Sequence, residues 1–223
     1  MSPAPGTPVG VSLLTPDPDA AAAFYAALLG WSREASVLSA PDGSPVADIR
    51  SPGALAPGWL VALHAEAGAT GEVEAAGGRS LGDGLVTDPA GAVFALGAPA
   101  VPLPARGPGR PAWFENMTTD AARADAFYGA VFGLQPQAAG DGYALLTAGG
   151  RPVAGRLELP PDLATAVGPR WMTYFAHADV DAGAAAVADL GGTVAVPPRD
   201  TPTGRVSAVV DPLGVLFTLL TPA

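Results

Sequence analysis

The same sequence pattern occurs twice in this chain. Residues 17–31 are DPDAAAAFYAALLGW, and residues 120–134 are DAARADAFYGAVFGL. Further landmarks recur in the same order: Phe24-Tyr25 with Phe127-Tyr128, Gly30 with Gly133, Trp59 with Trp171, and Asp88-Pro89 with Asp211-Pro212. An ordered duplication that extends through both halves indicates two homologous copies in one polypeptide, so a site in one copy has a counterpart in the other.

Length and composition agree with two globular domains. The chain has 223 residues, of which 49% are hydrophobic and 14% charged, and this is enough for two domains of about 100 residues each. Residues 99–110 are rich in proline and glycine and lack hydrophobic periodicity. We therefore expect a first domain over residues 1–98, a semi-rigid linker over 99–110 and a second domain over 111–223.

The absence of particular residue types excludes several chemistries. The chain has no cysteine, which excludes disulfides, thiolate metal sites and cysteine nucleophiles. All eleven basic residues are arginine, which excludes lysine Schiff-base chemistry and the lysine of a Walker-type phosphate loop. The net charge of −10 disfavours nucleic acid and anionic membranes as partners. Without a signal-peptide pattern or a long apolar run, we expect a cytoplasmic protein.

Short apolar runs alternate with helix signals in both copies. The runs over residues 9–14 and 113–117 suit strands, and each precedes a helix that Asp17 or Asp120 caps and a glycine ends. The Phe-Tyr pairs in these helices have the spacing of core residues. A second strand begins at Trp59 or Trp171, and a helix and further strands follow it. Each copy is therefore predicted to contain two βαβββ units.

Together these motifs resemble the vicinal oxygen chelate superfamily, which includes glyoxalases, bleomycin-resistance proteins and extradiol dioxygenases. The resemblance rests on the acidic start of the first helix and on AxxFYxxxLGW, DVDAxxxxxxxLGG and DPxGxxFxL. The second half is most similar to the tandem, actinobacterial hydroxylase-like branch. The resemblance implies an α+β fold of two tandem glyoxalase-like domains, in which four βαβββ modules form two curved half-barrel sheets around open cavities.

Members of that superfamily bind a divalent metal through His, Glu or Gln at defined strand positions. The resemblance maps these positions onto Gly10, Leu60, Ala95, Trp113, Met172 and Thr218. A lone threonine hydroxyl does not hold Fe, Ni, Zn or Mn. We therefore expect neither a metal nor another cofactor, which disfavours the metal-dependent activities of the superfamily.

Side chains alternate across a strand, so positions two and four residues beyond a former ligand position share its inward face. The predicted ligand-binding residues are Ser12, Leu60, Trp113, Glu115, Met117, Met172, Tyr174 and Thr218. Most of the large ones belong to the second copy, so we expect one dominant cavity there. Aromatic and thioether walls with few polar groups suit a bulky, partly planar organic ligand. By the same argument, Ser12→Ala is expected to affect binding little.

Several of these residues also have a structural interpretation. Trp113 either fills core volume or contacts a ligand, and His64 is either a loop histidine or a catalytic base. An inward Glu115 either pairs with an arginine or acts on a ligand. His177 has the opposite strand parity from Tyr174 and is assigned a structural role. Residues 197–205 form either a mobile lid or an ordinary exposed hairpin.

Two main functions remain open from the sequence. The first is metal-free binding of a bulky aromatic or polyketide-type small molecule, for sequestration or self-resistance. The second is metal-independent natural-product tailoring, in which Glu115 with Tyr174 or His64 catalyses a cyclisation, dehydration or isomerisation by general acid–base chemistry. A metal-dependent enzyme and an interaction module are the remaining alternatives. We also expect a monomer whose modules pair within the chain.

Overall fold

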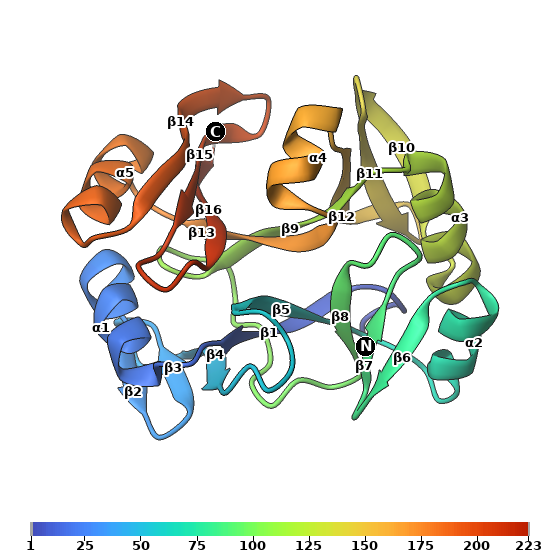
Figure 1. Ribbon diagram of the computed structural model, residues 1–223, viewed down its shortest axis with the longest axis horizontal. Coiled ribbons are helices and arrows are strands. Elements are labelled where there is room, and N and C mark those ends of the chain that lie inside the picture. Colours follow the sequence, from blue (N-terminus) through green and yellow to red (C-terminus); the bar gives the residue numbers. More distant parts are fainter. Residues whose placement is uncertain (1, 223) are drawn as a thin grey trace. The chain divides into compact units, whose positions relative to one another are not determined.

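The computed structural model describes residues 2–222, which form sixteen strands and five helices (Figure 1). The first copy contains β1 (Pro8–Leu14), α1 (Pro18–Leu29), β2 (Ser32–Glu34), β3 (Val37–Ser39), β4 (Pro45–Arg50), β5 (Gly58–Leu63), α2 (Ala69–Ala75), β6 (Arg79–Gly82), β7 (Leu85–Thr87) and β8 (Val93–Leu96). The second copy contains β9 (Pro111–Thr118), α3 (Ala121–Phe132), β10 (Gln135–Gly140), β11 (Tyr143–Ala148), β12 (Arg151–Glu158), α4 (Pro161–Val167), β13 (Arg170–Ala176), α5 (Val180–Asp189), β14 (Thr193–Thr201), β15 (Gly204–Val210) and β16 (Leu216–Pro222).

Each copy forms one curved, eight-stranded sheet within the described residues. The strand order is β2-β3-β4-β1-β5-β8-β7-β6 in the first sheet and β10-β11-β12-β9-β13-β16-β15-β14 in the second. The first and last strands of every βαβββ unit are parallel neighbours, as in β1 with β4 and β13 with β16. The predicted α+β fold with four βαβββ modules is therefore confirmed. Helix α4 was not predicted and has no counterpart in the first copy.

The helix boundaries follow the capping signals of the sequence. The Asp17 side chain accepts a hydrogen bond from the Ala20 backbone N–H, and Asp120 accepts one from Arg123. Both helices end at a glycine with a left-handed backbone, Gly30 at φ 71° and Gly133 at φ 70°. The aspartate caps satisfy N–H groups that a helix start leaves without partners. The predicted structural role of the two aspartates is confirmed.

The chain divides into two compact units, and each unit combines parts of both copies. Unit 1 contains the described residues up to 9 together with 60–99 and 114–172, and unit 2 contains residues 10–59, 100–113 and those from 173 onward. Helix α2 packs on α3 in unit 1, and α1 packs on α5 in unit 2. The boundaries 1–98, 99–110 and 111–223 delimit the sequence copies, and as domain boundaries they remain a proposal. Among residues 2–222, no helix has the length and apolar character needed to cross a bilayer.

The core of unit 2 is organised around the Tyr25 hydroxyl. It accepts a hydrogen bond from Trp59 Nε1 at 3.0 Å and donates one to Asp211 Oδ2 at 3.2 Å. The Tyr25 ring stacks on Trp31 and meets Phe217 at 5.5 Å. Burial raises the pKa of Tyr25 well above its usual value, and the Asp211 carboxylate raises it further. The phenol therefore stays protonated and remains a donor across the physiological range.

The core of unit 1 repeats this arrangement around Tyr128. Its hydroxyl accepts a hydrogen bond from Trp171 Nε1 at 2.9 Å and one from Asn116 Nδ2 at 3.0 Å, and it donates to Asp88 Oδ2 at 3.1 Å. In both units, tyrosine and tryptophan come from one copy, whereas the aspartate comes from the DPxG motif of the other. The aspartate is held by its own turn, since Asp88 Oδ1 accepts the backbone N–H groups of residues 90–92.

The proline-rich linker has an ordered attachment to unit 2. Trp31 Nε1 donates a hydrogen bond to the Gly109 carbonyl at 2.6 Å, and the Gly109 N–H donates to the Ala176 carbonyl at 2.7 Å. Gly109 has φ +67°, and a Cβ there would lie 3.0 Å from the Leu29 carbonyl. The close approach and the positive φ both require glycine at this position.

We expect the buried tyrosine networks to couple residues that are far apart in the sequence. Tyr25→Phe leaves the Trp59 N–H without its acceptor, so it should lower the free energy of unfolding by about 1–3 kcal/mol. In a double-mutant cycle with Asp211→Asn, the two effects should be non-additive by more than about 0.5 kcal/mol. The matched control is the cycle of Tyr25→Phe with Asp88→Asn, which should be additive because Asp88 belongs to the Tyr128 network. Urea unfolding measures both cycles, and additivity in the first would contradict the coupling.

Candidate functional site

The strand register places Tyr174 and Thr218 side by side in unit 2. Tyr174 on β13 is the parallel partner of Thr218 on β16, so both side chains project from the same face of the sheet. Their neighbours Phe175 and Phe217 project from the other face into the aromatic core. Thr218 is buried and Tyr174 is half-buried. The sheet therefore carries two hydroxyl groups on the face opposite the core.

In unit 1, Glu115 and Met117 on β9 lie on the face opposite the tyrosine network. The intervening Asn116 donates hydrogen bonds to Asp88 and Tyr128 on the core side. Glu115 is only 5% exposed, and Met117 is also buried. Their parallel partners on β12 are Gly155 and Leu157. The Glu115 carboxylate thus lies almost completely buried on this face of the sheet.

The two compact units divide the predicted ligand-binding residues. Unit 1 contains Leu60, Glu115, Met117 and Met172, together with the catalytic candidate His64, and unit 2 contains Ser12, Trp113, Tyr174 and Thr218. Met172 and Leu60 are buried, whereas Trp113 is half-buried. The register brings Tyr174 next to Thr218 within unit 2. Joint catalysis by Glu115 and Tyr174 remains a proposal.

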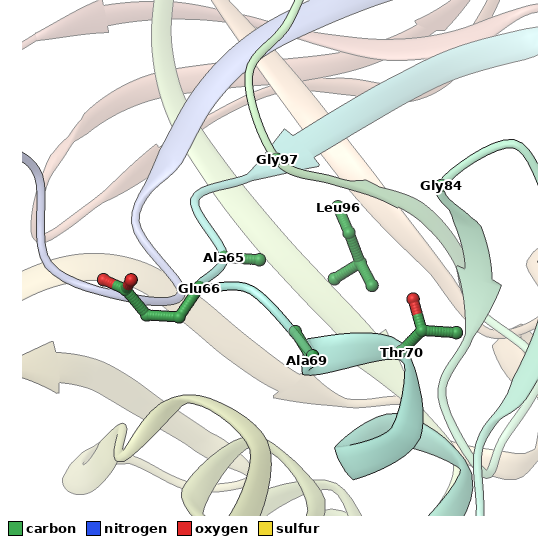
Figure 2. A pocket seen from close by; sticks show the side chains of 8 residues that line it. Ala65, Glu66, Ala69, Thr70, Gly84, Leu96 and Gly97 are labelled. Atoms are coloured by element: carbon green, nitrogen blue, oxygen red, sulfur yellow. The ribbon is translucent and has the colours of Figure 1, made fainter.

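His64 follows the end of β5 beside a small pocket. Its backbone N–H donates to the Thr7 carbonyl, and its side-chain Nε2 lies 3.9 Å from the exposed Glu66 carboxylate. The adjoining pocket has a volume of about 210 Å³ and is lined by Ala65, Glu66, Gly68, Ala69, Thr70, Gly84, Leu96 and Gly97. Figure 2 shows the Glu66 carboxylate pointing away from Leu96. This pocket is smaller than a typical drug-sized site and contains none of the predicted ligand-binding residues.

A polar cluster on the first sheet was not found from the sequence. Ser12 on β1 is the parallel partner of Asp48 on β4, and the Ser12 hydroxyl donates to Asp48 Oδ1 at 2.6 Å. Arg50 Nη2 donates to Ser12 Oγ at 3.0 Å. The signal in the sequence was the acidic Asp48 within the apolar run around it, together with an arginine two residues later. Because Ser12 joins two charged side chains, the structure argues against the expected small effect of Ser12→Ala.

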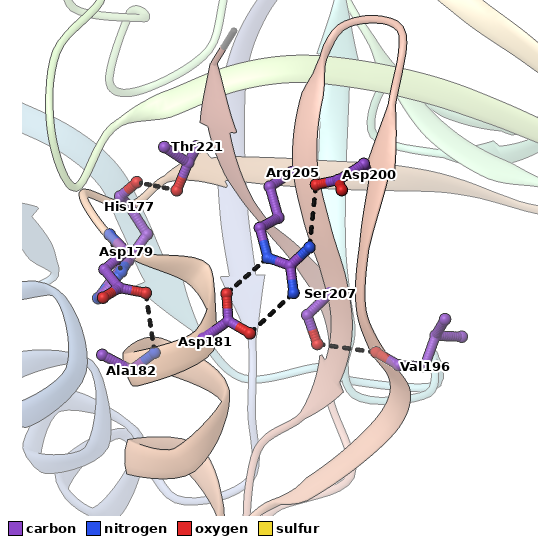
Figure 3. A network of polar contacts seen from close by, with 9 residues as sticks. All are labelled: His177, Asp179, Asp181, Ala182, Val196, Asp200, Arg205, Ser207 and Thr221. Carbon is purple, nitrogen blue, oxygen red and sulfur yellow. Dashed lines mark hydrogen bonds and ion pairs between the residues drawn. The ribbon is translucent and has the colours of Figure 1, made fainter.

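Residues 197–205 belong to a β-hairpin that ion pairs hold close to its turn. Strands β14 and β15 are antiparallel, with Thr201 opposite Gly204. Figure 3 shows the Arg205 guanidinium between two carboxylates, and it donates to Asp181 Oδ1 at 2.8 Å and to Asp200 Oδ1 at 2.9 Å. Arg205 holds the pKa of Asp181 below its usual value. Of the two interpretations from the sequence, this geometry favours the hairpin.

Comparison with known sequences gives relatives along nearly the whole chain. The sequence model of the Glyoxalase/Bleomycin resistance protein/Dioxygenase superfamily matches residues 110–219. The anthracycline biosynthesis protein DnrV of Streptomyces peucetius is 34% identical over 263 residues, which covers 97% of this chain and 94% of DnrV. CFP32, a candidate glyoxylase of Mycobacterium tuberculosis, is 33% identical over 98% of this chain and 95% of its own length.

Solved structures of low sequence identity share the fold. A Mn(II)-bound glyoxalase from Novosphingobium aromaticivorans superimposes with a TM-score of 0.62 at 19% identity, covering 98% of this chain and 83% of the other. An extradiol ring-cleaving dioxygenase from B. fuscum gives 0.63 at 15% identity and covers 99% and 73%. At these identities the similarity concerns the fold alone.

The donor set of this chain does not fit the metal that such structures suggest. The superfamily pattern maps its six ligand positions onto Gly10, Leu60, Ala95, Trp113, Met172 and Thr218. Their side chains offer one hydroxyl and one thioether, which are poor ligands for Mn²⁺, Fe²⁺ or Zn²⁺. Within residues 2–222, no three His, Asp or Glu side chains gather closely enough to hold a metal ion.

We expect the protein to bind less than about 0.1 equivalent of transition metal per chain because hard donors are missing at these positions. The measurement is elemental analysis after incubation with Mn²⁺, Fe²⁺, Ni²⁺ or Zn²⁺ and removal of free ions by gel filtration. About one bound ion per chain would show that another set of residues forms a metal site.

Proposed function

Because this chain belongs to the glyoxalase/bleomycin resistance protein/dioxygenase superfamily, we propose that it binds a bulky aromatic or polyketide-type small molecule without a metal ion. The observation that carries the proposal is the nearly complete burial of Glu115 beside Met117, on the sheet face opposite the core. Glu115 therefore places a carboxylate on the sheet face where the ligand is proposed to bind, where it can form a directed hydrogen bond.

The side chains proposed for binding in each unit suit a planar ligand. Trp113 and Tyr174 are both half-buried, so part of each side chain is exposed. Aromatic rings stack favourably on other planar rings. Met117 and Met172 adapt to irregular apolar shapes. DnrV and DauV, both relatives in sequence, are anthracycline biosynthesis proteins by name, which supports an aromatic polyketide as the ligand class. Binding would serve sequestration or self-resistance.

A second candidate function is metal-independent catalysis at the same residues. The burial of Glu115 favours it, since general acid–base catalysts are often carboxylates held within a site that excludes water. In this proposal Glu115 transfers a proton during a cyclisation, dehydration or isomerisation, with Tyr174 or His64 as its partner. We propose in addition that the chain acts as a monomer, and the pairing of modules from both copies within each unit supports this.

We expect Trp113→Ala to weaken binding of quinizarin, a neutral dihydroxyanthraquinone, by about 1–3 kcal/mol because an aromatic wall is lost. Fluorescence titration measures the affinity. Leu81→Ala is the matched control, since Leu81 is an exposed apolar residue on the edge strand β6 and its loss should leave the affinity unchanged. An unchanged affinity of the Trp113 variant would assign this residue to packing.

Glu115→Gln should separate binding from catalysis. Glutamine keeps the size and most of the hydrogen-bonding capacity but removes the titrating carboxylate. A binding protein should keep its quinizarin affinity within about threefold, whereas an acid–base enzyme should lose turnover by about 10² or more. Product formation from a panel of aromatic polyketides, followed by mass spectrometry, tests the second case. Wild-type protein that converts no member of the panel would favour binding.

A further inference from the structure

We propose that Arg50, oriented by Ser12 and Asp48, binds a carbonyl or phenolic oxygen of an aromatic ligand. This inference rests on the proposed function and specifies the ligand chemistry that unit 2 recognises. Arg50 is the group that would touch the ligand, and Ser12 and Asp48 are its positioning residues. None of the three has a metal-ligand role in the mapping of the superfamily pattern onto this chain.

The three side chains form a continuous chain of interactions. Ser12 Oγ donates to Asp48 Oδ1 at 2.6 Å, and it accepts from Arg50 Nη2 at 3.0 Å. Arg50 Nε also lies 3.5 Å from Asp48 Oδ2. The Asp48 side chain is 10% exposed, whereas that of Arg50 is 50% exposed. The buried partners therefore fix one edge of the guanidinium and leave part of it accessible.

The accessible part of the Arg50 guanidinium is suited to a neutral acceptor. A guanidinium has five N–H donors in one plane, and the contacts to Ser12 and Asp48 involve only two of its nitrogens. The Asp48 carboxylate compensates its charge, and the chain as a whole carries a net charge of −10. Such a surface disfavours phosphates and other polyanions. A ring carbonyl or phenol needs only directed hydrogen bonds, which the held guanidinium provides.

The location of the cluster agrees with a binding role. Ser12 on β1 corresponds to Glu115 on β9, and their register partners are Asp48 and Gly155. The next matched pair on the partner strands is Arg50 and Leu157. Both copies thus place polar chemistry at the same point of the sheet, but with different residues. Residues needed only to hold β1 to β4 would have no reason to differ in this way.

The test compares two probes with the same three fused rings. Quinizarin carries ring oxygens, whereas anthracene has none. Arg50→Gln should lower the quinizarin affinity about tenfold, which corresponds to the loss of one hydrogen bond to a charged group, and should leave the anthracene affinity within about twofold. Ser12→Ala and Asp48→Asn should lower the quinizarin affinity by about threefold to tenfold, again without affecting anthracene. Fluorescence titration with the full chain measures every affinity.

Arg33→Gln is the matched control because Arg33 also belongs to unit 2 and forms an ion pair with an aspartate, Asp19. It should change neither affinity. Arg50→Lys keeps the charge but loses the planar arrangement of N–H donors, so it should also lower the quinizarin affinity without affecting that for anthracene. It replaces Arg50→Gln if that variant unfolds at a lower urea concentration than the wild type.

The outcomes separate this inference from the function on which it rests. Wild-type protein that binds neither probe would overturn the proposed function and the Arg50 site together. If both probes bind and the Arg50 variants change neither affinity, or change both equally, the binding function stands and the Arg50 site is wrong. A selective loss of quinizarin affinity in the Arg50 variants supports both the binding function and the Arg50 site.

Discussion

The fold depends on a buried tyrosine hydroxyl that connects the two copies. In each unit, a phenol from a helix accepts a hydrogen bond from an indole of its own copy and donates one to a carboxylate of the other copy. None of these groups is exposed enough to use water as a substitute partner. Since an unsatisfied buried polar group costs about 1–3 kcal/mol, neither copy can complete its core alone. The interaction explains why the compact units are composed of residues from both copies.

The core has kept its symmetry, whereas the opposite sheet face has lost it. Tyr25 and Tyr128 each have a tryptophan donor and an aspartate acceptor at equivalent positions, so packing and hydrogen bonding constrain these positions in both copies. On the other face, Ser12 faces Asp48 in one sheet and Glu115 faces Gly155 in the other. Positions that only need to fill a core would not exchange a serine for a glutamate. The divergence therefore marks the face on which ligand chemistry differs between the units.

Local signals predicted the helices and strands well because caps and glycine stops act within a few residues. Asp17, Asp120 and Gly30 identified helix ends, and the duplication itself predicted the four modules. The hydrogen bond from Tyr25 to Asp211 spans 186 residues, so no local pattern could reveal it. Helix α4 has no buried residue, so its sequence has little apolar periodicity to indicate it. The Ser12 and Asp48 contact depends on strand pairing, which the sequence did not specify.

The side chains on the face opposite the core differ between the two sheets. This difference implies that the two units select different ligands. A metal ion recognises a ligand oxygen by its negative charge. The residues at the superfamily's metal-ligand positions in this chain are poor metal ligands, so they do not provide this kind of recognition. A guanidinium compensated by a buried carboxylate instead recognises direction, because its N–H bonds point along fixed lines while its net charge is small. In the proposed function, the Glu115 carboxylate of unit 1 would instead accept a hydrogen bond from a ligand hydroxyl. On the proposed function, unit 2 would therefore select carbonyl or phenolic oxygens that accept, and unit 1 hydroxyls that donate, so the pattern of oxygen substituents would decide which ligand each unit accepts.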